Sequence, residues 1–259
     1  MPGQSVTTVP AVLFLEPSLP TNPFAGKLQA KLYWMATTAA VICGLAGLAL
    51  GGEAVWWSPA LNLKSFAAIG DRLAQPFDDP VDEIHNGQTV PATDCVSLLA
   101  LRARGFSGKG DFGFAQERYL GAQCLTLTTL RDAGRPVVVQ TAFALTPASV
   151  DVLPPTLAMA LSGVDYDAAK RAEAEGKSWR MYQPGLSAAM DHDTLIVRDG
   201  TGVVRARVYA EGDFTGDGEQ GLIVATGETV TDGTYSNTKL FLLARRGSLD
   251  RFTTVRRQQ

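Results

Sequence analysis

Residues 193–257 read DTLIVRDGTGVVRARVYAEGDFTGDGEQGLIVATGETVTDGTYSNTKLFLLARRGSLDRFTTVRR. Runs rich in β-branched and aromatic residues alternate with short polar breaks, and VVRARVYAE at 203–211 alternates apolar and charged residues. Such alternation is typical of strands that expose one face, and Asp-Gly pairs between apolar runs are typical of turns. The Asp-Gly pairs stand at 199–200, 217–218 and 232–233. We therefore predict a C-terminal antiparallel β meander.

The residues before the meander favour helices. Thr93 and Asp94 are both good N-caps for a helix that runs to Arg104. A further helix is expected over residues 114–132, with a stop at Gly134, and the glycine-rich segment between the two helices is expected to be a turn. Helices followed by strands indicate an α+β fold with a helical middle region.

Weaker patterns complete the expected domain, which covers residues 93–259. The β-branched segment PVVVQTAF at 136–143 predicts a strand. Residues 165–175 predict a short polar helix whose charges form a solvated face. Residues 53–92 are weakly patterned, and we interpret them as a linker with a short helix near 61–73.

The N-terminal part has two compositions. Residues 1–31 contain five prolines and are expected to form a flexible tail, whereas residues 32–52 carry no charge and follow Lys27 and Lys31. The uncharged segment is long enough to cross a bilayer, and the lysines favour an N-terminus in the cytoplasm. A signal peptide, an uncleaved transmembrane anchor and a buried core helix all fit this pattern. We expect export, with the C-terminal domain periplasmic or anchored outside the inner membrane.

Charge and cysteine content narrow the function classes. Lys plus Arg is 23 and Asp plus Glu is 26, and the resulting net charge of −3 argues against phosphate-driven nucleic-acid binding. With two His and three Cys in the chain, a His/Cys zinc cluster is disfavoured. Cys43 lies in the uncharged segment, which leaves Cys95 and Cys124. Two cysteines in an oxidising compartment predict a disulfide.

One loop, in GDFTGDGEQGLIVATG at 212–227, carries side-chain oxygens at alternating positions. The residues are Asp213, Thr215, Asp217 and Glu219. This spacing matches the start of a calcium-loop pattern, in which alternate positions direct several oxygens at one hard cation. The loop resembles that of FG-GAP/VCBS-type β repeats, whose usual form is close to DFNGDGxxDLxV, and the end of uncharacterised exported bacterial proteins that carry one such loop.

The loop also departs from the family pattern. Thr215 replaces an Asn or Asp, and Gly221 replaces an Asp. Val224 stands where an EF-hand places its bidentate Glu. Calcium takes about 6–8 oxygens. We therefore expect at most weak calcium binding, or a turn whose aspartates accept hydrogen bonds from backbone N–H groups.

A catalytic constellation is hard to find. His85 precedes Asn86-Gly87, which predicts a turn, whereas His192 stands between Asp191 and Asp193. A carboxylate can orient a histidine as a general base, but no Ser or Cys nucleophile accompanies the pair.

The sequence favours a non-catalytic exported or membrane-anchored envelope protein that binds an envelope protein or a cell-wall component, and not nucleic acid. Residues 32–52 would add membrane contact if uncleaved, and the alternative is an extracytoplasmic hydrolase that uses the three residues 191–193.

Overall fold

The computed structural model describes residues 53–134, 137–138, 143–245 and 251–258. All of these residues belong to one compact unit, Gly52–Gln259. The predicted tail at 1–31 and the predicted export segment at 32–52 lie outside the described residues. None of the helices in the described ranges is long and apolar enough to cross a membrane.

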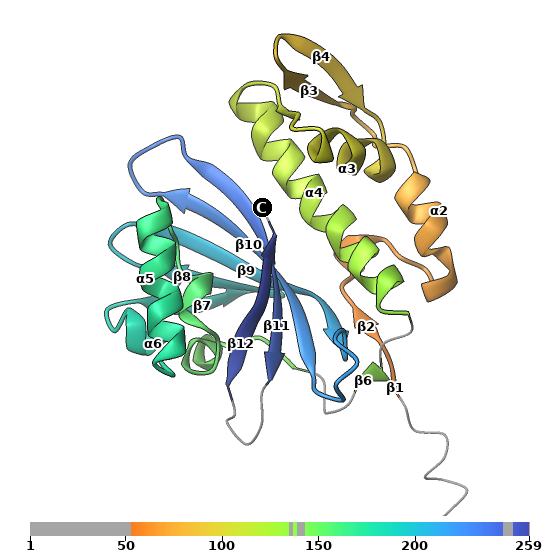
Figure 1. Ribbon diagram of the computed structural model, residues 1–259. Helices are drawn as coiled ribbons and strands as arrows, with labels where there is room; N and C mark the ends of the chain where they lie inside the picture. Colours follow the sequence, from red (N-terminus) through yellow and green to blue (C-terminus); the bar gives the residue numbers. More distant parts are fainter. Residues whose placement is uncertain (1–52, 135–136, 139–142, 246–250, 259) are drawn as a thin grey trace, which may run out of the picture. The chain divides into compact units, whose positions relative to one another are not determined.

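A seven-stranded antiparallel sheet is the largest element of this unit (Figure 1). Six strands lie side by side in the order of the chain: β7 (Ser187–Asp191), β8 (Thr194–Arg198), β9 (Gly202–Gly212), β10 (Gly221–Val230), β11 (Ser236–Arg245) and β12 (Phe252–Gln258). The short strand β2 (Trp56–Trp57) pairs with the end of β9. The predicted meander is therefore confirmed, and it gains β7 at one edge.

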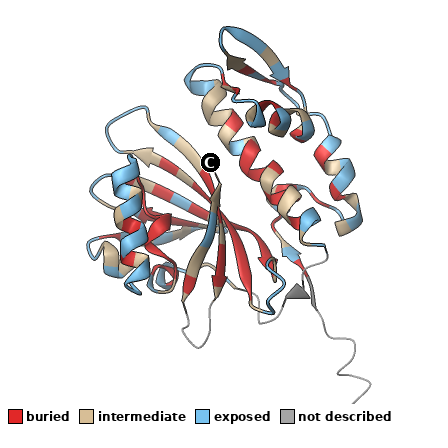
Figure 2. Ribbon diagram, in the orientation of Figure 1, coloured by how far each residue is buried: buried red, intermediate tan, exposed pale blue. Residues whose placement is uncertain are grey.

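Helices and a small sheet pack on one face, and we call them the helical layer. Its elements are α2 (Ile69–Ala74), α3 (Cys95–Ala103), α4 (Gly110–Asp132), β3 (Val81–His85), β4 (Gln88–Ala92) and β5 (Ser107–Gly108). Ile223 and Ala225 of β10 join Leu98 and Leu127 of these helices in one buried cluster. Figure 2 shows this burial along α4 and the strands that face it.

A second layer covers the opposite face. It consists of η3 (Pro147–Asp151), η4 (Pro155–Leu157), α5 (Gly163–Ala174) and α6 (Trp179–Tyr182). Leu222 and Val224 of β10 pack here with Leu153 and Trp179. Because successive side chains of a strand point to opposite faces, β10 alternates between the two cores. The helices and strands confirm the α+β class.

Residues 53–92, interpreted from the sequence as a linker with one short helix, form several elements. These are β1 (Glu53–Ala54), β2, η1 (Pro59–Leu61), η2 (Phe66–Ala68), α2 and the β3–β4 hairpin. The predicted turn at Asn86-Gly87 is confirmed, since both residues have positive φ, 48° and 80°, as a tight hairpin turn requires. Of the strand predicted at 136–143, β6 (Val137–Val138) pairs with β1, whereas 136 and 139–142 lie outside the described residues.

The helix boundaries follow local signals, with one correction. The Asp94 side chain caps α3 by accepting from the Ser97 backbone N–H at 2.7 Å. The segment before residue 114, predicted as a turn, instead holds β5 and the first turn of α4. A Cβ on Gly108 would stand 2.1 Å from the carbonyl oxygen of Gly113. Only glycine permits this close approach, which the glycine pattern alone did not reveal.

Candidate functional site

The predicted disulfide joins the two longest helices of the helical layer. Cys95 is the first residue of α3, and Cys124 lies in the middle of α4. The Cα atoms are 5.3 Å apart, and both side chains are buried in the core shared with the sheet. The Cys95–Cys124 prediction is confirmed, and the bond closes a loop with a sequence separation of 29.

The calcium-like loop connects β9 to β10. The Asp213 carboxylate accepts from the backbone N–H groups of Thr215, Gly216 and Gly218, at 3.2, 2.7 and 2.8 Å. These three contacts use both of its oxygens inside the turn. Such a carboxylate would have to give up backbone contacts to ligate a cation.

The other predicted ligands lie around the same turn. An Asp217 oxygen accepts from the backbone N–H of Glu219 at 2.9 Å, and the Thr215 hydroxyl contacts Asp213 at 3.5 Å. Among the described residues, no group of three or more His, Cys, Asp or Glu side chains is placed to hold a metal ion. The geometry of the loop corresponds to a turn stabilised by its aspartates.

The candidate hydrolase residues form the tip of the β7–β8 hairpin. His192 adopts a positive φ of 53°, and its side chain is 93% exposed. Its Nδ1 lies 2.9 Å from Asp191, while the Asp193 carboxylate pairs with Arg207 at 2.9 Å. His192 and Asp193 border a small hollow of about 210 Å³ whose other walls are apolar, including Trp56. The tip brings the three residues together and leaves the imidazole in solvent.

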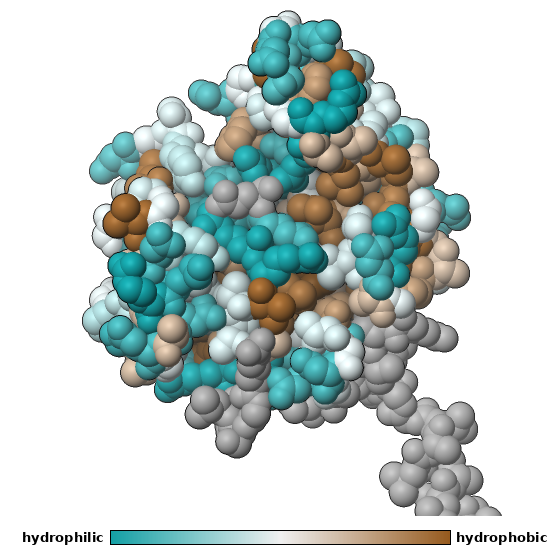
Figure 3. Space-filling model, viewed as in Figure 1, coloured by the Kyte–Doolittle hydropathy of each residue, from teal (hydrophilic) through white to brown (hydrophobic). Residues whose placement is uncertain are grey.

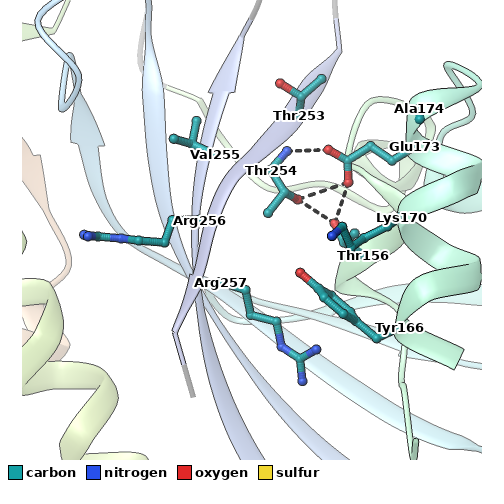
Figure 4. Close-up of a pocket in the computed structure, with 10 residues that line it drawn as sticks. All are labelled: Thr156, Tyr166, Lys170, Glu173, Ala174, Thr253, Thr254, Val255, Arg256 and Arg257. Atoms are coloured by element: carbon teal, nitrogen blue, oxygen red, sulfur yellow. Dashed lines mark hydrogen bonds between the residues drawn. The ribbon is translucent and has the colours of Figure 1, made fainter. Parts of the chain in front are cut away.

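A larger pocket, of about 870 Å³, lies between η4, α5 and β12 (Figure 4). Its lining residues are Thr156, Tyr166, Lys170, Glu173, Ala174, Thr253, Thr254, Val255, Arg256 and Arg257. In the view of Figure 3, hydrophilic residues dominate the surface over β12, whereas apolar residues gather over α3 and α4. We call the pocket between η4, α5 and β12 the α5–β12 pocket.

Glu173 ties α5 to the edge strand of the sheet. One carboxylate oxygen accepts from the Thr254 backbone N–H at 2.5 Å. The other accepts from the Thr254 hydroxyl at 3.1 Å and from the Thr156 hydroxyl at 2.8 Å. β12 pairs only with β11 within the seven-stranded sheet, so this carboxylate caps an edge N–H that would otherwise face solvent. The sequence placed Glu173 on a solvated helix face, but the structure gives it a structural role.

Tyr166 forms the aromatic wall of the pocket. The Arg257 guanidinium lies 3.9 Å from its ring centroid, and the Lys170 ammonium lies 6.0 Å from it. Burial raises the pKa of the Tyr166 phenol, and the charge of Arg257 together with a side-chain hydrogen bond between the two residues opposes that rise. Tyr166, Lys170 and Glu173 stand at i, i+4 and i+7, so a helical-face reading of this segment would have found them together.

Two groups of buried charges lie behind these surfaces. In the second layer, the Lys239 ammonium contacts both Glu228 oxygens at 2.5 Å and donates to the Ala160 carbonyl at 3.3 Å. In the helical layer, Glu117 pairs with Arg102 at 3.0 Å. Glu83 is buried beside that pair, and neither of its oxygens has a hydrogen-bond partner among the described residues.

No family model matches this chain, and no curated protein or solved structure matches it.

Proposed function

We propose that the protein is a non-catalytic binding protein of the cell envelope, exported across the cytoplasmic membrane. The Cys95–Cys124 disulfide carries this proposal. Both cysteines are buried in the core of the helical layer, where the bond joins α3 to α4. Such structural disulfides persist in oxidising compartments, which fits the export segment expected at 32–52.

The described geometry favours binding over catalysis. A general base works best when it is held near the bound substrate and shielded from water, but the His192 side chain is 93% exposed at a hairpin tip. The α5–β12 pocket has the volume of a small-molecule site. In this proposal the ligand is an envelope component, and the Asp213–Glu219 loop binds calcium weakly or serves only as a turn.

A fusion experiment tests the proposed location. Alkaline phosphatase joined after residue 60 of the full N-terminal sequence should be active, because that enzyme forms its disulfides only outside the reducing cytoplasm. A matched fusion that lacks residues 32–52 should be inactive at equal protein level. An inactive first fusion at normal protein level would contradict export.

The hydrolase alternative rests on the small hollow beside His192 and Asp193. His192→Ala separates the two functions. A binding protein should keep its captured envelope ligand, because the imidazole lies outside the α5–β12 pocket. Hydrolysis of an envelope substrate by the wild type, abolished in the variant, would replace the binding proposal with the hydrolase.

A further inference from the structure

The α5–β12 pocket holds cations in an otherwise acidic protein. The chain has a net charge of −3, yet Lys170, Arg256 and Arg257 line this pocket beside a single acid, Glu173. Figure 4 shows the Arg256 side chain directed away from the others, so Lys170 and Arg257 are the cations on the Tyr166 side. The pocket thus concentrates positive charge where the protein as a whole has none in excess.

The nearby acids already have cationic or hydrogen-bond partners. Both oxygens of Glu173 accept hydrogen bonds from η4 and β12. Glu228 interacts electrostatically with Arg257. Both of its carboxylate oxygens contact the Lys239 ammonium. Asp167 is the remaining acid near Tyr166, and it is exposed and absent from the pocket lining. The net charge of the groups that line the pocket therefore stays positive.

The Arg257 donor is also held in place before any ligand arrives. The Arg257 guanidinium stacks on the Tyr166 ring at 3.9 Å, which restricts a side chain that is otherwise flexible. A stacked guanidinium still presents N–H groups at its edge, and its planar fork suits carboxylate and phosphate oxygens. Ordering a side chain in advance lowers the entropic cost of binding.

Tyr166 adds a neutral donor between the two cations. Its hydroxyl points towards β12 in Figure 4, on the side where Lys170 and Arg257 lie. The phenol is neutral, and its O–H group can donate a hydrogen bond. An ammonium, a phenol and a guanidinium together present donors of three kinds to one oxyanion.

We propose that the α5–β12 pocket binds the oxyanion of a small ligand, a carboxylate or a phosphate, through Lys170, Tyr166 and Arg257. The proposal names the ligand chemistry of the binding function above and rests on that function, but not on export. The volume of about 870 Å³ fits a small molecule, and the anion occupies its Tyr166 side. Thr156 and Thr254 hold the opposite wall through Glu173.

Calorimetric titration of the full chain tests the proposal. Inorganic phosphate and citrate serve as separate probes at constant ionic strength, so a response to one of them identifies the oxyanion type. At least one probe should bind saturably with a 1:1 stoichiometry. Arg257→Gln and Lys170→Gln should each weaken that binding about tenfold, because each removes one charge-assisted contact.

Two further variants serve as controls, one for the Tyr166 hydroxyl and one for the loss of a positive charge outside the pocket. Tyr166→Phe keeps the aromatic wall and removes the hydroxyl, so it should weaken binding severalfold while leaving the melting temperature close to that of the wild type. Lys177→Gln removes the same charge outside the pocket lining, from a residue paired with Glu175, and should leave affinity unchanged. No saturable binding of either probe, or an equal loss in the Lys177 variant, would overturn the proposal. Neither result would bear on the fusion test of export.

Discussion

The two layers that cover the sheet differ in how their buried carboxyl groups are compensated by neighbouring charges. In the second layer, Glu228 and Lys239 lie diagonally across β10 and β11 and contact each other at 2.5 Å. In the helical layer, Glu83 is fully buried beside Glu117, a like charge. In the first arrangement the opposite charges offset part of the desolvation, although burial still raises the pKa of Glu228 and lowers the pKa of Lys239. The second arrangement leaves a carboxyl whose ionisation is opposed.

This contrast shows where each layer obtains its stability. The second layer depends on a matched ion pair, and the loss of either partner exposes the other to a low dielectric. The helical layer contains an unfavourable carboxyl and is also the layer that carries the disulfide. A covalent constraint on the unfolded chain offsets part of that cost. Variants of the two layers should therefore respond differently to pH and to reduction.

The largest effect is expected from Lys239→Met. The substitution leaves Glu228 buried without its cation, which should lower the free energy of unfolding by about 3–5 kcal/mol near neutral pH. Urea titration followed by circular dichroism measures the change. The loss should shrink at acid pH, because burial already raises the pKa of Glu228 and protonation removes the charge.

The double variant Glu228→Met/Lys239→Met is the matched control. Replacing both ions with apolar side chains of similar volume should recover most of the stability lost in the single variant. If the double variant were as unstable as Lys239→Met alone, packing rather than charge would explain the loss, and the contrast between the layers would fail.

Removal of the disulfide should rank next. Cys95→Ala/Cys124→Ala opens a loop with a sequence separation of 29, for which the chain-entropy model gives roughly 3–4 kcal/mol. Chemical unfolding of oxidised wild type and of the double variant measures the difference. Reduced wild type should unfold like the variant, and a difference below about 1 kcal/mol would show that the bond does not support the helical layer.

Glu83 should give the helical layer a pH dependence. Burial, with a contribution from Glu117, raises its pKa to about 7, while Arg102 and Arg118 act in the opposite direction. The folded state then binds a proton at Glu83 more tightly than the unfolded state, so the contribution of Glu83 to stability is largest below about pH 4.5 and is lost as the pH rises to about 7. The loss is on the order of 3 kcal/mol.

Glu83→Gln isolates this contribution. The variant cannot ionise at this position, so the difference between its stability and that of the wild type should grow in its favour from pH 4.5 to pH 7. Urea titrations across that interval measure the difference. A constant difference over the whole range would mean that Glu83 does not titrate there, and that the charges of Arg102 and Arg118 outweigh its burial.

The smallest effect is expected in the loop between β9 and β10. Asp213→Ala removes an acceptor of three backbone N–H groups that stay exposed to water, so the loss should be about 1 kcal/mol. Differential scanning calorimetry measures it. Calcium in the millimolar range should shift the wild-type melting temperature by little or nothing, and a large shift lost in the variant would establish an ion site.

The sequence predicted elements whose signals are local. The strands of the meander carry alternation and Asp-Gly turns, and α3 carries its cap at Asp94. β7 has the sequence SAAMD, whose small residues have low strand propensity, and it forms because β8 pairs with it. β3 contains charged residues and β4 contains Pro91, and neither feature is typical of a strand. Only the turn between them was recognisable from the sequence.

The pocket shows the limit of local signals. The four-residue spacing of Tyr166 and Lys170 in the sequence predicts that they share one helix face. Their partner Arg257 lies on a strand that is distant in the chain. No periodicity links α5 to β12. The disulfide was predictable for a different reason, because a compositional count left Cys95 and Cys124 as the pair outside the predicted export segment.

The order of elements along the chain also has a consequence for biogenesis. The helices that hold Cys95 and Cys124 precede every strand of the meander, and a loop of this length closes at modest entropic cost. β2 must instead wait for Glu211 and Ala210 of β9, which are synthesised much later. Oxidation of the helical pair therefore does not have to wait for the meander, and the sheet can then assemble against two covalently joined helices.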